Sequence, residues 1–297
     1  PSLLLVLSLS CCLQYCHSYR PVVLIHGLNA GNGTTNHARA LLEARFPGIF
    51  VTAPNIGNGP FDSLFMNMEH QGMLLCEEIK STPQLAQGFN VIGFSQGGLN
   101  ARTLLQRCPG VPPIFNFISW VVPQAGVFGI PVGMDVKDYH EIYEAMAEML
   151  WSMPYAPVAQ AALSVANWWV DPFDYDTFLQ KCIYLPDLNN LGVYKNESYK
   201  AQFLRLQSLT LLYSTEDDQV IPKESGWFSF YAINDTSRIV PMEETPFYQE
   251  DWLGLRQLAE EQRLIKGQTH CQHQDYFSKC FDTYFEKYVI PIIANSN

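Results

Sequence analysis

The residues best suited to chemistry lie in the run NVIGFSQGG, where an apolar stretch ends in Gly93-x-Ser95-x-Gly97. A helix-like segment, 99–108, follows directly. A strand, a sharp turn that carries serine and a helix are the three parts of a nucleophile elbow. The glycines let the strand and helix approach each other and let the serine backbone tolerate strain. The sequence therefore predicts that Ser95 is a nucleophile and that the Gln96 N–H lies at a helix N-terminus, where it can stabilise an anion.

A serine nucleophile needs a base, and the base needs a carboxylate that orients it. In hydrolases with this elbow, the acid and then the histidine follow the serine along the chain. The strand-like run 209–213 leads into a turn that contains Glu216, Asp217 and Asp218. A carboxylate just after the end of a strand is suitably placed, but position alone does not choose among these three.

The choice of base is also open, because two of the seven histidines lie after the last strand-like run and before the last helix-like segment. These are His270 and His273, and sequence order alone gives only a mild preference between them. His26 ends the first apolar run, and we expect its ring to be packed or hydrogen-bonded while it shapes the neighbouring loop. The backbone N–H groups of Leu28 and Gln96 would then form the oxyanion hole.

The elements that must position these residues follow from the alternation of short apolar runs and helix-period segments, which is typical of a parallel sheet covered on both faces. The expected strands are 22–25, 49–52, 90–94, 115–121, 209–213 and 263–265, and the expected helices are 35–46, 63–79, 97–108 and 274–288. Between about 124 and 205 this regularity breaks. Met and aromatic residues recur there at helical spacing, which predicts a helical insertion with its own core, and its flexible apolar side chains are suited to lining an acyl-chain groove.

Composition restricts the class of protein. The 297 residues are 47% hydrophobic and 16% charged, which favours a folded enzyme with a sizeable core. The net charge is −11, and no Lys/Arg-rich stripe is present, which argues against binding to nucleic acid or to anionic membranes. No Cys/His spacing is typical of a metal site; the cluster of His270, Cys271 and His273 lacks a second cysteine pair.

Several features predict a secretory route. Residues 1–18 have the pattern of a signal peptide with a truncated first region, and no later segment is long enough to be a transmembrane anchor. Glycosylation sequons begin at Asn32, Asn196 and Asn234. Beyond the signal five cysteines remain, so at least one thiol is expected to be free or paired outside the chain.

A series of motifs runs through the chain in a fixed order: VLIHG at 23–27, GFNVIGFSQGG at 88–98, QRCP at 106–109, GVFGIP at 126–131, WWxDP at 168–172, NESYK at 196–200, WFxFY at 227–231, PMEET at 241–245 and LGL at 253–255. This series resembles the palmitoyl-protein thioesterases, which are lysosomal α/β-hydrolases that cleave fatty acyl thioesters. The resemblance implies one α/β-hydrolase domain over 19–297, with a mostly parallel central sheet, flanking helices and the insertion near the active site.

The resemblance also implies residue roles. Counting back from Pro222 and from Trp227, as the family spacing suggests, reaches Asp217 as the acid. The first histidine after the glycine near the chain end is His270, which becomes the expected base. The stretch from His270 to Pro291 is longer than expected for the family, so His273 remains the alternative.

The same resemblance implies a disulfide between Cys76 and Cys108, which would close a loop of roughly 30 residues and contribute about 3–4 kcal/mol in the chain-entropy model. Cys271 and Cys280 are a candidate second bridge. The pairing of Cys182 stays open.

The implied activity is hydrolysis of long-chain acyl thioesters through an acyl-enzyme, without a metal or organic cofactor, in the lysosome or the secretory lumen. Motif details lean both to S-acylated protein and to acyl-CoA as the carrier, so the carrier stays open, as do chain-length preference and oligomeric state. An oxygen-ester lipase or esterase with the same triad is the nearest rival, and a non-catalytic fatty-acyl carrier is a more distant one.

Overall fold

The computed structural model describes residues 19–130, 140–275 and 278–295, so the predicted signal peptide at 1–18 lies outside the described residues. The centre of the molecule is a six-stranded sheet in the order β2-β1-β3-β4-β5-β8, in which all neighbouring strands are parallel. The strands are β1 (Val22–Ile25), β2 (Val51–Thr52), β3 (Phe89–Phe94), β4 (Ile114–Trp120), β5 (Ser208–Ser214) and β8 (Leu264–Thr269). The α/β-hydrolase fold class is confirmed.

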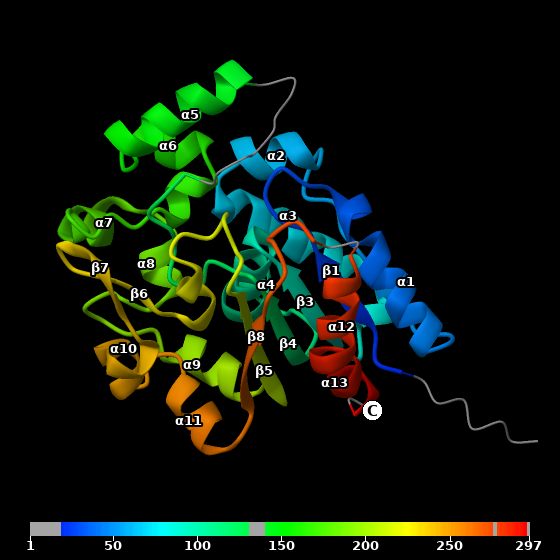
Figure 1. Cartoon of the computed structure of the whole chain (residues 1–297). Coiled ribbons are helices and arrows are strands. Elements are labelled where there is room, and N and C mark those ends of the chain that lie inside the picture. The colour runs from blue at the N-terminus through cyan, green and yellow to red at the C-terminus, as the bar shows by residue number, and fades with distance from the viewer. Residues whose placement is uncertain (1–18, 131–139, 276–277, 296–297) are drawn as a thin grey trace, which may run out of the picture.

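Helices cover both faces of this sheet (Figure 1). Every residue of β1 and β3 is buried, as expected for strands in the middle of a parallel sheet. Leu24 and Ile92 share one apolar cluster with α1 (Asn36–Arg45), α12 (Lys279–Tyr288) and α13 (Ile290–Ala294). Val23 and Val91, one position away, face the opposite cluster with the other helices. That second face is covered by α3 (Met68–Ser81), α4 (Gln96–Arg107), α9 (Glu197–Leu204) and α11 (Leu255–Glu260).

Within the insertion, the described residues 140–205 form a mostly helical region, whose first helices lie above the sheet in Figure 1. Its helices are α5 (His140–Ser152), α6 (Pro157–Ala162), α7 (Tyr175–Lys181), α8 (Leu185–Leu188) and α9. A cluster that includes Leu150, Trp169 and Phe178 forms its core and extends to Leu99 on α4. Other apolar side chains of this region stay exposed, among them Trp151 at 54%. The insertion therefore has both the small core and the exposed apolar surface that its sequence suggests.

Some predicted elements differ in detail. The expected helix at 63–79 is two helices, α2 (Pro60–Phe65) and α3, because Met66 is extended and the Asn67 side chain caps α3 by accepting the His70 N–H. The helix expected at 274–288 is α12, which begins at Lys279 after the N-cap Ser278, and α13 follows it. The sequence analysis missed an antiparallel hairpin, β6 (Phe230–Ala232) and β7 (Asp235–Val240), next to the short helix α10 (Pro246–Gln249).

The cysteines form two bridges, Cys76–Cys108 and Cys271–Cys280. Among the described residues Cys182 is the free cysteine, and burial raises the pKa of its thiol to about 11. A buried thiol of raised pKa is unreactive, so this cysteine has a packing role. In the ranges that the structure describes, no helix has both the length and the apolar character needed to cross a membrane.

Candidate active site

Ser95 occupies a tight turn between β3 and α4. Its backbone has φ 51° and ψ −130°, a conformation that a non-glycine residue rarely adopts and that is typical of strained functional turns. The Ser95 N–H donates to the Trp120 carbonyl at 2.9 Å, which ties the turn to β4. A Cβ at Gly97 would lie 2.3 Å from the Ile25 carbonyl oxygen, and one at Gly93 would lie 2.4 Å from the Gly98 Cα. The glycines thus permit the close packing that a nucleophile elbow requires.

The loop after β1 passes directly beside this serine. A Cβ at Gly27 would lie 3.0 Å from the Ser95 Cβ and 3.6 Å from its Oγ, so the backbone leading to Leu28 borders the nucleophile. The buried His26 ring holds the loop, because its Nε2 accepts the Ile56 N–H at 3.1 Å and its Nδ1 donates to the Gly27 carbonyl at 3.0 Å. Burial lowers the pKa of His26, which keeps the ring neutral for these bonds. The predicted hydrogen-bonded role of this histidine is confirmed.

The side chain of Gln96 fixes the start of α4. Its amide nitrogen donates to the Ser63 carbonyl at 2.9 Å and to Gln71 Oε1 at 3.1 Å. Its amide oxygen accepts the Trp168 indole N–H at 3.2 Å, which joins the insertion to the elbow. The roles of Gln71 and Trp168 were not predicted. Burial of Gln71, which marks it as a hydrogen-bonding residue, became visible only in the structure.

A carboxylate and a histidine meet in the turns that follow β5 and β8. The His273 Nδ1 lies 2.8 Å from Asp217 Oδ2 and 3.0 Å from Oδ1. The side chains are 9% and 2% exposed, respectively. Asp217 Oδ1 also accepts the backbone N–H groups of Gln219 and Val220, each at 2.9 Å. Three donors thus hold a desolvated carboxylate in one orientation, whereas the neighbouring acids of the turn, Glu216 and Asp218, are exposed.

The expectation that His270 pairs with Asp217 is wrong. The exposed His270 ring places its Nδ1 2.6 Å from the Thr215 Oγ1, away from the carboxylate. The reason is the alternation of burial after β8: residues 269, 271 and 273 are buried, and 270 and 272 are exposed. The first histidine therefore faces outward, and the second, three residues later, faces the acid.

Two further contacts join the acid and base turns. The Thr215 N–H donates to the Thr269 carbonyl at 3.0 Å. The buried Ser214 hydroxyl donates to the Cys271 carbonyl and accepts the Glu216 N–H at 3.3 Å. Ser214 thereby fixes the separation of the two turns that carry Asp217 and His273.

Metal binding finds no support in the described part of the chain. The one group of closely spaced ligand-type side chains there is Cys271, Asp275 and Cys280, and its two cysteines are bonded to each other, so they offer no thiolate. The sequon asparagines at 32, 196 and 234 are exposed. Glycosylation of these positions stays a prediction.

Comparison with known proteins gives a consistent result. A model of the palmitoyl protein thioesterase family matches residues 21–273. Palmitoyl-protein thioesterase 3 of Dictyostelium discoideum is 40% identical over 296 residues, covering 99% of this chain and 98% of that protein. Palmitoyl-protein thioesterase 1 of Caenorhabditis elegans is 32% identical over 253 residues, covering 82% and 83%, respectively. Lysosomal thioesterase PPT2 of Homo sapiens is 28% identical over 251 residues, covering 84% and 80%.

Solved structures support the fold alone. The monoacylglycerol lipase of Paleococcus ferrophilus gives a TM-score of 0.51 at 14% identity, covering 94% of this chain and 97% of that one. A ferulic acid esterase gives 0.51 at 11% identity, covering 93% and 84%. Because the family model spans most of the sequence, and a relative at 40% identity spans nearly all of it, this thioesterase hydrolase belongs to the palmitoyl protein thioesterase family.

Proposed function

We propose that the chain hydrolyses long-chain fatty acyl thioesters, with Ser95 as nucleophile, His273 as general base and Asp217 as the carboxylate that orients the base. The observation that carries this assignment is the buried contact of the His273 Nδ1 with both Asp217 oxygens. Because Asp217 accepts at Nδ1, the neutral ring carries its proton there and presents Nε2 as the basic atom. Ser95, Asp217 and His273 all follow carboxyl ends of strands in one parallel sheet, so they belong to the same edge.

The reaction takes two steps. His273 Nε2 accepts the Ser95 hydroxyl proton as Oγ attacks the thioester carbonyl, and the Leu28 and Gln96 N–H groups stabilise the oxyanion. The carbon–sulfur bond then breaks, and the leaving thiolate takes up the proton held by the base. In the second step His273 accepts a proton from water, the resulting hydroxide attacks the acyl-enzyme, and Ser95 leaves with that proton as the fatty acid is released.

The helical insertion carries apolar side chains that favour a fatty acyl group as part of the substrate. Its exposed apolar side chains include Trp151 at 54% and Met153 at 50%. Trp151 packs edge-on against Trp169 with ring centroids 5.0 Å apart. The preceding residue, Trp168, donates its indole N–H to the side-chain oxygen of Gln96, whose backbone N–H belongs to the proposed oxyanion hole. The exposed apolar side chains of the insertion are suited to contact a fatty acyl chain.

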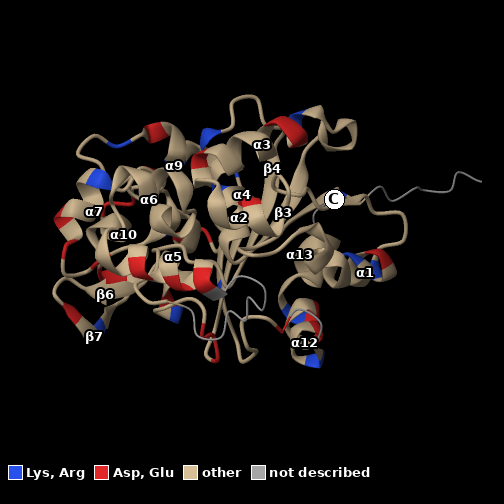
Figure 2. Ribbon diagram, turned by 90° about the horizontal axis from the view of Figure 1, so that it is seen from above, with Lys and Arg blue, Asp and Glu red and all other residues tan. Residues whose placement is uncertain are grey.

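Charge favours a protein as the acyl carrier. Helix α5 carries the exposed acids Glu141, Glu144 and Glu148, which are red in Figure 2, and contains no lysine or arginine. Because like charges repel, this surface is a poor match for the phosphates of coenzyme A and a better match for an S-acylated peptide with basic residues. We propose a lumenal, lysosomal site of action, by similarity to the lysosomal thioesterases among the relatives.

The test is release of free thiol from a palmitoylated cysteine peptide and from palmitoyl-CoA, measured for the wild type and for Ser95→Ala. We expect turnover of both by the wild type, a higher kcat/KM for the peptide, and loss of both in the variant. Equal rates for wild type and variant would refute the mechanism. Faster cleavage of a matched oxygen ester than of the thioester would instead identify an esterase.

A further inference from the structure

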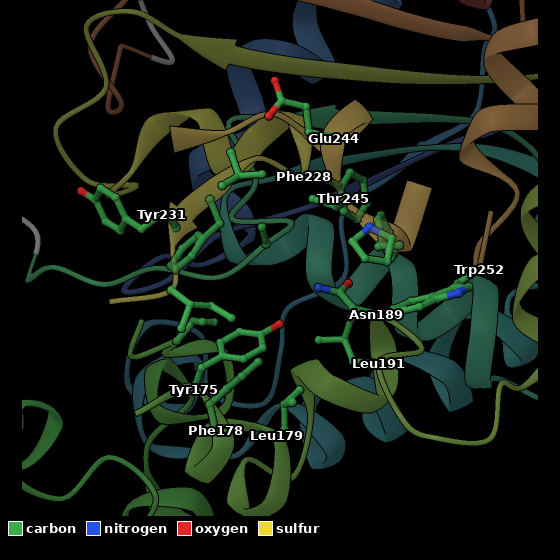
Figure 3. Close-up of a pocket in the computed structure, with 18 residues that line it drawn as sticks. Tyr175, Phe178, Leu179, Asn189, Leu191, Phe228, Tyr231, Glu244, Thr245 and Trp252 are labelled. Atoms are coloured by element: carbon green, nitrogen blue, oxygen red, sulfur yellow. The ribbon is translucent and has the colours of Figure 1, made fainter. Parts of the chain in front are cut away.

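A second pocket lies away from the catalytic residues, between α7, the β6–β7 hairpin and α10. Its volume is about 420 Å³, a size suited to a small molecule. Eighteen residues line it, most of them apolar or aromatic (Figure 3). Ser95, Asp217, His273, Leu28 and Gln96 are not among them.

The walls of this pocket are aromatic. Phe228 stacks on Phe247 with ring centroids 5.5 Å apart, and Trp252 meets Phe247 edge-on at 6.3 Å. Leu179 and Ile233 line the pocket and are also 38% and 62% exposed, so they mark its opening to solvent. An aromatic interior with apolar side chains at its entrance is suited to a hydrocarbon chain.

Two polar groups face the interior. The Tyr175 hydroxyl has no hydrogen-bond partner among the residues that the structure describes, and it points into the pocket toward Asn189 (Figure 3). The buried Asn189 amide is held by Arg102, which donates to its oxygen at 2.7 Å. Its nitrogen donates one hydrogen to the Gln124 carbonyl at 3.1 Å, which leaves the second for a ligand. Both groups therefore have a hydrogen to donate to a ligand oxygen in the pocket.

Charge restricts the ligand further. No lysine, arginine or histidine lines the pocket, and its one carboxylate, Glu244, points away from the centre and is paired with Arg238 at 3.4 Å. Two cations contact the lining without being part of it. The fully buried Arg102 lies behind the Phe228 ring, 5.1 Å from its centroid, and the Lys195 Nζ lies 3.2 Å from the Trp252 ring centroid. A negatively charged head group would thus meet no cation inside the pocket.

We propose that this pocket is a second lipid site, which binds the hydrocarbon chain of an uncharged single-chain lipid whose oxygen bonds to Tyr175 and Asn189. The site is separate from the acyl-thioester site at Ser95 and holds its ligand without covalent chemistry. An experiment that refutes this lipid site would therefore leave the proposed hydrolytic mechanism unaffected, and the reverse also holds.

Trp252 provides a direct readout, because bromine quenches tryptophan fluorescence only at short range. The probe is brominated oleyl alcohol, which has an uncharged head and no ester or thioester to hydrolyse; it is titrated into the wild-type protein. We expect quenching that saturates as the probe concentration rises. The share of this quenching that comes from Trp252 should disappear in the Trp252→Phe variant. Quenching that depends on Trp151 instead would place the chain at the insertion surface and overturn the proposal.

Two variants test the lining. Tyr175→Phe removes only the hydroxyl. We expect the affinity for the brominated alcohol, measured by the quenching of Trp252, to fall about threefold to tenfold, as for one lost hydrogen bond. Ala232→Phe places a large ring in the pocket from β6, and we expect it to abolish the quenching of Trp252. Tyr143→Phe on α5 is the matched control, since that tyrosine does not line the pocket, and it should leave quenching unchanged.

Brominated oleic acid, with an ionised head, should bind more weakly than the alcohol. Tighter binding of the acid, or unchanged binding in both Tyr175→Phe and Ala232→Phe, would refute the proposed site. Thioester turnover by each variant is measured in parallel. Normal turnover shows that the variant is folded. If the proposed lipid site does not exist, thioester turnover is still expected.

Discussion

Replacing each of the two C-terminal histidines by alanine gives opposite expectations. His273→Ala removes the ring that contacts both oxygens of the Asp217 carboxylate, and with it the proposed base. Loss of one member of a triad typically lowers kcat by about 10⁴-fold or more, which corresponds to about 5 kcal/mol of transition-state stabilisation. His270→Ala removes one exposed hydrogen bond to Thr215, worth about 1 kcal/mol, so activity should stay within roughly fivefold of the wild type.

The fold should survive both changes. In His273→Ala the Asp217 carboxylate keeps its two backbone donors, Gln219 and Val220, and so is not left unpaired in the interior. Circular dichroism and thermal unfolding verify this. The assay is thiol release from a palmitoylated peptide under single-turnover conditions, which separates acylation from product release.

The refuting result is specific. A folded His273→Ala protein with wild-type turnover, together with an inactive His270→Ala, would mean that the contact with Asp217 is structural and that the outward-facing ring turns inward to act. Loss of activity in both variants would show that the Thr215–His270 contact is needed to hold the two turns in place.

Three other predictions concern the same site. Asp217→Asn should lower kcat by about 10⁴-fold because the amide favours the wrong histidine tautomer, whereas Asp218→Asn, at an exposed position, should leave turnover unchanged; equal effects would contradict the assignment. Ser214→Ala should lower kcat more than it changes KM, with recovery in Ser214→Thr, because the hydroxyl joins the acid and base turns; a change in KM alone would argue against a positioning role. His26 has a lowered pKa in the folded state, so its contribution to stability is present above the ordinary histidine pKa of about 6.5 and is lost as pH falls toward the lowered value. Urea unfolding at about pH 7 and about pH 5 measures how much stability the protein loses on acidification. We expect this loss to be smaller in His26→Asn than in the wild type. An identical loss in the two proteins would mean that carboxylates account for the loss.

The elbow could be predicted from sequence because its parts are contiguous. A strand, Gly93-x-Ser95-x-Gly97 and a helix lie within one short segment, and the lack of a Cβ at the glycines is a local property. The parallel sheet was predictable for the same reason, since runs buried on both faces are apolar throughout.

The turn that carries the acid was predictable, because a turn after a strand is a local feature. Position alone did not choose among its three carboxylates; the family spacing suggested Asp217, which is the one that contacts a histidine. The base was not predictable from order alone. His270 and His273 lie in the same turn, and only the burial alternation after β8, with Ser214 holding the Cys271 carbonyl, decides which ring faces the acid.

The second pocket depended on tertiary structure entirely. Its lining comes from segments between Ala125 and Trp252 that the fold brings together, and its hairpin β6–β7 was not among the predicted strands. Burial and the direction of a side chain in a turn are set by the elements that pack around it. A local pattern therefore indicates which residue types are present at a site, and packing determines which of them meet.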